Sequence, residues 1–249
     1  MKKPPKFSII VPHYQWDGSA GIRHTTFMRG MNSIVAQTFT DFEVLVYHDG
    51  PPSEPELLKE SPFPVIVTKT RHNDFGHSLR DMGIKKATGE YIIHTNPDNV
   101  FYSHALEKLD EASSDTRFNH FIKTYYKYHI NLEAIERSAK NLNNILVYPI
   151  YLMGTKCFGV HIIRMRTKYD KRDDDGTSVW DEQFKHLCTG NPPVANNIDA
   201  MQLVMKRSMW LEHGGWYDRK ENGDSVMYEK FITANQGAQY LTEVLGEHY

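Results

Sequence analysis

The N-terminal half of the chain alternates short apolar runs with segments whose apolar residues recur every three or four positions. Residues 7–11 form an apolar run bounded by prolines, which is typical of a strand buried on both faces. Similar runs predict strands at residues 42–47, 64–68 and 91–95. Helical spacing predicts a helix through Phe27, Met31 and Ile34, a second over residues 78–87 that ends near Gly89, and a third that begins at Ser103.

The C-terminal half is less regular. We expect strands or extended segments at residues 119–128, 145–153, 158–163, 200–206 and 240–245, helices at 132–142 and 226–234, and a charged loop at 168–178. The chain contains no internal repeat and no clear linker, so we expect a single domain over residues 1–249.

Alternating strands and helices predict an α/β fold with a mostly parallel sheet. In such sheets ligands bind beyond the carboxyl ends of the strands. Three polar clusters follow predicted strands, at residues 12–14, 48–50 and 96–99. The topology therefore predicts a ligand site that these three clusters share.

Charge and cysteine content narrow the class of protein. The formal net charge is −2, which argues against a dedicated nucleic-acid or anionic-membrane surface. Two cysteines exclude a disulfide framework and favour a reducing compartment. No apolar run reaches the length of a membrane span, and the first apolar run is too short for a signal peptide. We expect a cytoplasmic protein.

Five sequence segments, in this order, carry a family resemblance. They are Phe7-Ser-Ile-Ile-Val-Pro-His-Tyr14, Ser33-Ile-Val-Ala-Gln-Thr-Phe39, Val46-Tyr-His-Asp-Gly-Pro51, Ala87-Thr-Gly-Glu-Tyr-Ile-Ile-His-Thr-Asn-Pro-Asp98, and Gly214-Gly-Trp-Tyr-Asp218 followed by Gly223-Asp224. The ordered set resembles the inverting glycosyltransferases of family 2. Lys69-Thr-Arg71 and Ile198-Asp199 are nearest to the spore-coat polysaccharide type within that family.

The resemblance implies the GT-A fold, with a nucleotide-binding half (residues 1–112) and an acceptor-binding half (residues 113–249). It implies transfer of a sugar from a nucleoside-diphosphate sugar, with UDP as the expected nucleotide, to a hydroxyl acceptor, most simply a glycan. It also implies a divalent metal, Mn²⁺ or Mg²⁺, because a cation held by carboxylate oxygen can absorb the charge of the leaving diphosphate.

Individual roles follow from the same resemblance. Asp98 matches the metal-binding aspartate of the family's acidic motif, and Asn96 replaces the first aspartate, which usually contacts ribose. His248 matches a histidine that some GT-A enzymes use as a further metal ligand. The alternative for Asp98 is a turn residue, since Asn-Pro-Asp-Asn is also good turn sequence.

The same resemblance implies which residues contact the nucleotide. Asp49 matches the aspartate that accepts a hydrogen bond from the base, and the alternative is a ligand-free Asp-Gly-Pro turn. Arg71 matches an arginine that contacts uracil or diphosphate, and Arg80 has a similar but weaker match. Pro12 and Tyr14 would line the base pocket, although Tyr14 could equally cap the core.

Asp224 is the expected general base. It precedes an apolar helical pattern, and a carboxylate opposite the leaving group can deprotonate the attacking hydroxyl. The alternative role is helix N-capping, and Glu221 and Glu229 are the substitutes if the alignment shifts.

Two other functions stay open at this stage: a sugar-phosphate nucleotidyltransferase, or a module that binds a nucleotide or glycan without turnover. The first usually has a glycine-rich loop after the first strand, which is absent here. Trp180, Trp210 and Trp216 could stack on sugars or simply fill the core, and Trp216, beside Gly214 and Gly215, is the best candidate for an acceptor wall. Cys157 and Cys188 have no common zinc spacing to histidines and are expected to be buried thiols.

Overall fold

The computed structural model describes residues 3–14, 24–114, 144–152, 186–194, 197–220 and 223–249. The strands are β1 Phe7–His13, β2 Phe42–His48, β3 Val65–Val67, β4 Tyr91–His94, β5 Val100–Phe101, β6 Ile145–Val147, β7 Ile150–Leu152, β8 His186–Cys188, β9 Leu203–Lys206, β10 Gln239–Tyr240 and β11 Gly246–His248. The helices are α1 His24–Val35, α2 Pro55–Leu58, α3 His77–Lys86, α4 Ala105–Ser114, α8 Arg207–Glu212 and α9 Gly223–Ala234.

The described strands form two sheets. The larger sheet has seven strands in the order β10-β6-β9-β4-β1-β2-β3, and the smaller has four in the order β5-β11-β7-β8. In the larger sheet β1 is parallel to both β2 and β4, and only β9 runs antiparallel to its neighbours. The mostly parallel α/β sheet predicted from the sequence is therefore confirmed.

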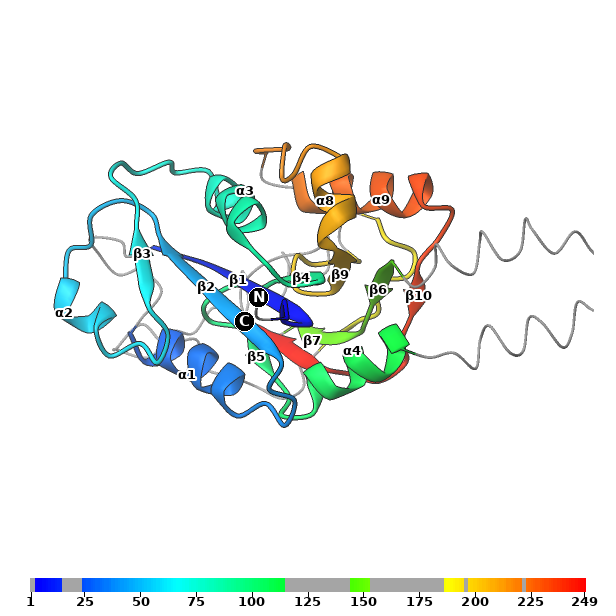
Figure 1. Ribbon diagram of the computed structural model, residues 1–249, viewed down its shortest axis with the longest axis horizontal. Helices are drawn as coiled ribbons and strands as arrows, with labels where there is room; N and C mark the ends of the chain where they lie inside the picture. The colour runs from blue at the N-terminus through cyan, green and yellow to red at the C-terminus, as the bar shows by residue number, and fades with distance from the viewer. Residues whose placement is uncertain (1–2, 15–23, 115–143, 153–185, 195–196, 221–222) are drawn as a thin grey trace, which may run out of the picture.

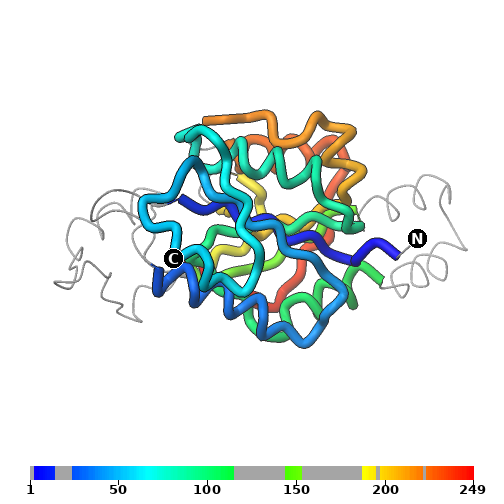
Figure 2. The backbone as a smooth tube through the Cα atoms, turned by 60° about the vertical axis from the view of Figure 1, so that its left-hand side comes forward, coloured from blue at the N-terminus to red at the C-terminus, as the bar shows by residue number. Residues whose placement is uncertain are grey.

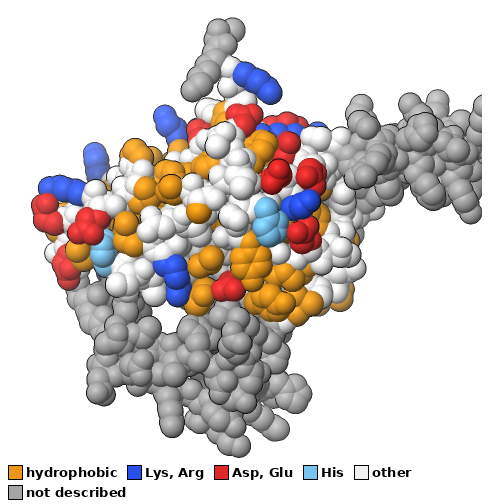
Figure 3. Space-filling model, turned by 90° about the horizontal axis from the view of Figure 1, so that it is seen from below, with side chains coloured by type: hydrophobic (Ala, Val, Ile, Leu, Met, Phe, Trp, Pro, Cys, Tyr) orange, Lys and Arg blue, Asp and Glu red, His pale blue; other side chains and the backbone are white. Residues whose placement is uncertain are grey.

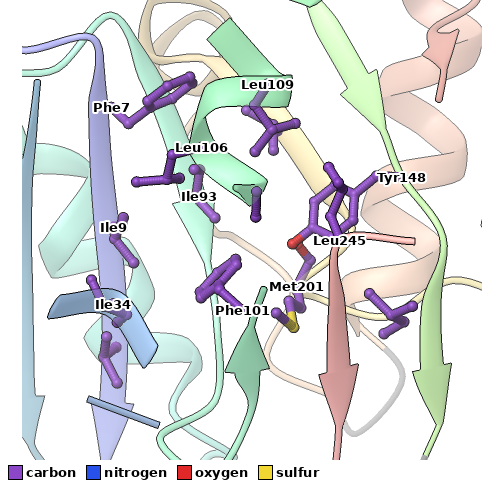
Figure 4. Packing of buried hydrophobic residues seen from close by; sticks show 14 of the residues in the cluster. Phe7, Ile9, Ile34, Ile93, Phe101, Leu106, Leu109, Tyr148, Met201 and Leu245 are labelled. Carbon is purple, nitrogen blue, oxygen red and sulfur yellow. The ribbon is translucent and has the colours of Figure 1, made fainter. Parts of the chain in front are cut away.

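Helices cover both faces of the larger sheet, as Figures 1 and 2 show. α1 and α4 lie on one face, where their apolar side chains join β1 and β4 in one buried cluster that Figure 4 shows in part. α3, α8 and α9 lie on the other face and form a second cluster with Ile10 and Ile92 of the same strands. Because β1 and β4 are covered on both faces, their sequences read as continuous apolar runs rather than as alternating ones.

Most predicted elements of the first half lie within a residue or two of their predicted bounds. Gly89 does not end the helix as predicted, because α3 ends at Lys86 with Ala87 as its C-cap residue. A Cβ atom at Gly89 would lie 2.6 Å from Ser8 Oγ and 2.7 Å from Ser8 N, so a glycine is needed there for close packing against β1.

Predictions for the second half are less accurate. The strand expected at 240–245 is wrong, because β10 ends at Tyr240 and β11 begins only at Gly246. The short elements β5, β8 and α8 were not predicted, since a few residues are too short to show a period. The elements expected at 119–128, 132–142, 158–163 and 168–178 lie outside the described residues.

The surface carries both signs of charge. On the face seen in Figure 3, the described Lys and Arg side chains are interspersed with Asp and Glu, in agreement with the net charge of −2. Among the described helices, we find none with the length and apolar character needed to cross a bilayer.

Candidate functional site

The three polar clusters meet at one edge of the larger sheet, as the topology predicts. β1 and β2 are paired so that His13 lies beside His48, and both strands end there. β4 ends at His94, which pairs with Ile10 of β1, so the turn at residues 96–99 emerges at the same edge. Burial lowers the pKa of His13 to about 3 and lowers that of His48, so both imidazoles are neutral at pH 7.

Asp49 is only 5% exposed and holds the loop that follows β3. Its Oδ1 accepts a hydrogen bond from the His72 amide at 2.8 Å, and its Oδ2 accepts one from the Asn73 amide at 3.0 Å. Arg71 Nε donates to the Asp49 carbonyl oxygen at 3.2 Å. Asp49 and Arg71 are therefore brought together, and the carboxylate has a structural partner on each oxygen that the sequence did not indicate.

Pro12 lies beneath the same loop. A Cβ atom at Gly76, whose φ is +78°, would lie 2.7 Å from Pro12 Cβ and 3.0 Å from Arg80 Nη1. The loop therefore packs directly on Pro12, and Gly76 is required both by its backbone angle and by this contact. Tyr14 is half-buried and directly follows β1 at this edge of the sheet.

Arg80 projects from α3 beneath the polar edge and is 3% exposed. Its Nη2 donates to Asn96 Oδ1 at 2.6 Å and its Nη1 donates to the Phe75 carbonyl at 2.9 Å. The guanidinium also lies 5.1 Å from the centroid of the Trp216 ring. Burial lowers the pKa of Arg80, but a guanidinium stays protonated at neutral pH. The structure thus places a buried positive charge directly behind Asn96.

Asp98 lies in a turn that directly follows β4. The Asn99 amide donates to the Asn96 carbonyl at 3.2 Å, which closes the turn. Asp98 Oδ1 is buried and has no hydrogen-bond partner among the described residues. A buried carboxylate oxygen without a partner is costly unless a ligand completes it, and oxygen ligands of this kind suit Mg²⁺ or Mn²⁺.

The described residues contain no group of three or more His, Cys, Asp or Glu side chains that could form a metal cage. Asp98 would supply a single carboxylate ligand, and Mg²⁺ bound by one or two carboxylates is usually completed by substrate phosphates and water.

His248 is brought next to this turn by strand pairing. β11 runs antiparallel to β5, with Glu247 opposite Val100, so the next position of β11 lies beside Asn99. The Tyr249 amide donates to Asn99 Oδ1 at 3.4 Å. The His248 ring is almost fully buried, and its Nδ1 lies 3.2 Å from Asp199 Oδ1.

Asp224 lies in the first turn of α9, and its Oδ1 accepts a hydrogen bond from the Ser225 amide at 2.8 Å. Burial raises the pKa of Asp224 to about 6, and the charge of Asp199 adds to this rise. The Ser225 amide, Arg80 and His248 oppose it. A carboxyl with such a pKa is ionised at neutral pH yet basic enough to accept a proton, which is what general base catalysis requires.

The match to known families decides the class of protein. The sequence model of glycosyl transferase family 2 matches residues 8–177, which is more than half of the chain. The chain belongs to glycosyl transferase family 2.

Curated relatives of this family 2 member are named as glycosyltransferases. An "Uncharacterized glycosyltransferase" of Rickettsia bellii (strain RML369-C) is 28% identical over 148 residues, which are 56% of this chain and 19% of the relative. "Uncharacterized glycosyltransferase YibD" of Escherichia coli (strain K12) is 29% identical over 112 residues, 44% of this chain and 30% of the relative. The chain thus spans about a fifth to a third of the length of these relatives.

Solved structures show that the family 2 glycosyltransferase has the expected GT-A fold. S. aureus TarS 1–349 in complex with UDP-GlcNAc matches with a TM-score of 0.56 and 12% identity, over 97% of this chain and 58% of that one. The mannosyltransferase PcManGT from Pyrobaculum calidifontis, in complex with GDP-Man and Mn²⁺, has a TM-score of 0.56 and 12% identity, over 98% and 57% of the two chains.

The interpretation of Trp216 as an acceptor wall of the glycosyltransferase is wrong. Its side chain is 0% exposed and stacks on Trp210 with ring centroids 5.5 Å apart. Its Nε1 donates to His77 Nδ1 at 2.8 Å, and His77 Nε2 in turn donates to the Lys220 carbonyl at 2.7 Å. Trp216 is therefore part of the core between α3, α8 and α9.

Two features of the site were missed or underused by the sequence analysis. Asp199 lies beside His248, and its charge helps to raise the pKa of Asp224. In the sequence it stands out only as part of the family pattern Ile198-Asp199, with no indication of either neighbour. Arg29 was not predicted as a site residue, although its Nη2 donates to the Asp98 carbonyl at 3.3 Å.

Cys188 is a buried thiol, as expected, and burial raises its pKa to about 12. Trp180, Cys157 and Glu221 lie outside the described residues.

Proposed function

We propose that this glycosyltransferase moves a sugar from a UDP-sugar to a hydroxyl group of a glycan acceptor, with inversion at the anomeric carbon and with the aid of a divalent cation. One observation carries the proposal. The buried, unpartnered Asp98 Oδ1 and the Arg80–Asn96 contact lie at the carboxyl edge of one sheet, and Asp224 is near enough to Arg80 and His248 for their charges to act on its carboxyl.

The nucleotide would bind over β1 and β2. In this proposal Pro12 and Tyr14 line the base pocket, and Asp49 accepts a hydrogen bond from the base. A carboxylate has about four lone-pair sites, so the two backbone amides on Asp49 leave capacity for one more donor. Arg71 lies on the loop that Asp49 holds and would contact the uracil or the diphosphate.

The diphosphate would lie between Asn96 and Asp98. Asn96 offers an amide group to the ribose, and the buried charge of Arg80 directly behind it attracts phosphate. Asp98 and His248 would hold Mn²⁺ or Mg²⁺. A cation bound there would neutralise the charge that develops on the leaving diphosphate.

Asp224 would act on the acceptor. Its carboxylate accepts the proton of the acceptor hydroxyl while the hydroxyl oxygen forms a bond to the anomeric carbon. The bond between that carbon and the phosphate oxygen breaks, and its electron pair leaves with UDP. A single displacement of this kind inverts the configuration. The remaining described part of residues 113–249 would contact the acceptor, and the whole chain would act as one domain.

Two of the structural neighbours support a nucleotide-sugar donor. S. aureus TarS 1–349 has been solved with UDP and with UDP-GlcNAc, and PcManGT with GDP-Man and Mn²⁺. Both share only the fold with this chain, so the identities of the nucleotide and of the metal require direct measurements.

Nucleotide selectivity is the first test. UDP with Mn²⁺ is expected to raise the melting temperature most, by roughly 5–10 °C at 100 times its Kd, because a ligand that binds only the folded state stabilises it. GDP, CDP and dTDP, each with and without Mn²⁺, are the comparison set in a thermal-shift assay. A melting temperature that no nucleotide changes would contradict the proposal.

The pH dependence of turnover is the second test. Since the base must be ionised, kcat/KM for the donor at a fixed acceptor concentration is expected to rise with pH and level off above about 6, the pKa of Asp224. A pH series that spans this value measures it. A profile that falls with rising pH across this range would exclude a carboxylate base with this pKa.

A further inference from the structure

One side of α1, together with the residues directly after it, holds the backbone that follows the Asp98 turn. The Phe101 amide donates to Ser33 Oγ at 3.1 Å. Gln37 Nε2 donates to the Tyr102 carbonyl at 2.8 Å, and Gln37 Oε1 accepts from the Leu106 amide at 3.0 Å. Side chains of the Ser33-Ile-Val-Ala-Gln-Thr-Phe39 segment thus make contacts all along residues 101–106.

The same side of α1 contacts the turn itself. A Cβ atom at Gly30 would overlap the Pro97 carbonyl oxygen and lie 2.9 Å from the Asn99 carbonyl oxygen. Ser33 Oγ donates to the Gly30 carbonyl at 2.6 Å while it accepts from Phe101. The Ser33 hydroxyl therefore ties the closest point of α1 to the strand that follows Asp98.

The contact between Gln37 and Leu106 is shielded from water, and the contacts of Ser33 are partly buried. Gln37 is 6% exposed, and the Leu106 amide that it binds is buried. A buried amide that loses its partner cannot readily bind water instead, so it either moves or stays unpaired at a cost in free energy. The Leu106 amide is therefore expected to shift when Gln37 is replaced, and the partly buried Phe101 amide is expected to loosen when Ser33 is replaced.

We propose that Ser33 and Gln37 are positioning residues that fix the Asp98 carboxylate where a divalent cation binds. The inference rests on the proposed metal role of Asp98. It gives a physical task to a motif that the sequence analysis used only as a mark of resemblance. Both side chains would act through the backbone that follows the Asp98 turn, because their hydrogen bonds go to the Phe101 amide and the Tyr102 carbonyl.

Binding of Mn²⁺ to the full chain in the presence of UDP, followed by electron paramagnetic resonance of the free ion, tests the proposal. Ser33→Ala is expected to raise the Kd for Mn²⁺ about tenfold, as loss of supporting groups around metal ligands commonly does. Ser33→Thr keeps the hydroxyl and is expected to retain the wild-type Kd. Asn32→Ala, at an exposed position of the same helix, is the matched control and is expected to leave the Kd unchanged.

A second measurement needs no metal. Amide hydrogen exchange at Phe101 in the metal-free protein is expected to be faster in Ser33→Ala than in wild type or Asn32→Ala. Alanine favours the helix more than serine does, so the variant is expected to fold. Gln37→Met, which removes both hydrogen bonds at similar length, provides a second variant with the same expected rise in Kd.

The outcomes separate the two proposals. If wild type binds Mn²⁺ with UDP and both variants keep its Kd, the positioning inference is overturned and the proposed function stands. If wild type does not bind Mn²⁺ at all, the metal role of Asp98 fails and the inference fails with it. A raised Kd in both variants, together with faster exchange at Phe101 in Ser33→Ala, supports the positioning role.

Discussion

Asp224→Asn is expected to lower kcat by about 10³-fold while the Kd for UDP stays close to that of wild type. The amide has nearly the shape of the carboxylate, and its side-chain oxygen can still accept the hydrogen bond from the Ser225 amide. It cannot accept the proton of the acceptor hydroxyl. Turnover measured as UDP release, together with a calorimetric Kd for UDP, separates the loss of chemistry from a loss of binding.

The same variant is expected to fold at least as stably as wild type at pH 7. Burial raises the folded-state pKa of Asp224 from 3.8 to about 6, so the folded chain holds this proton more tightly than the unfolded chain. The contribution of the carboxyl to stability therefore falls as pH rises from about 3.8 to about 6 and stays low above that range. An uncharged asparagine avoids this cost, which thermal unfolding at pH 7 measures.

Glu229→Gln is the matched control for Asp224→Asn. Glu229 lies further along α9, is exposed, and was the substitute base suggested by the sequence. Its variant is expected to keep wild-type kcat. A large loss in Glu229→Gln, with wild-type turnover in Asp224→Asn, would move the base to Glu229 and shift the family alignment at this point.

The parts of the fold that were predictable depend on local pattern. β1 and β4 appear in the sequence as short apolar runs because each is buried between two layers of helices. The alternation with helices then makes the strands parallel, and parallel strands place residues 12–14, 48–50 and 96–99 at one edge. No contact between residues distant in the sequence is needed to predict this shared edge.

The parts that were not predictable depend on contacts between distant residues. Trp216 and His77 are far apart in the sequence, and their hydrogen bond is one of the contacts that place the tryptophan in the core. Asp199 follows no apolar strand pattern of its own, and its proximity to His248 follows from packing between segments far apart in the chain. Local periodicity carries no information about either pair.

Asp98→Asn is expected to remove the metal-dependent part of nucleotide binding and to lower kcat by at least about 100-fold. The substitution keeps the size of the side chain and exchanges an anionic oxygen for an amide, which is a poor ligand for a hard divalent cation. The Kd for UDP measured with Mn²⁺ is then expected to rise to the value measured without it. Calorimetric titrations of UDP with and without Mn²⁺ provide both values.

Asp41→Asn is the matched control, because Asp41 is an exposed aspartate beside the amino end of β2, at the opposite edge of the sheet. It is expected to keep both the Kd for UDP and its dependence on Mn²⁺. If Asp98→Asn keeps the metal dependence of wild type, the cation must bind elsewhere, and the buried Asp98 Oδ1 must find its partner within the protein. Asp98 would then be the turn residue that its sequence Asn-Pro-Asp-Asn equally suits.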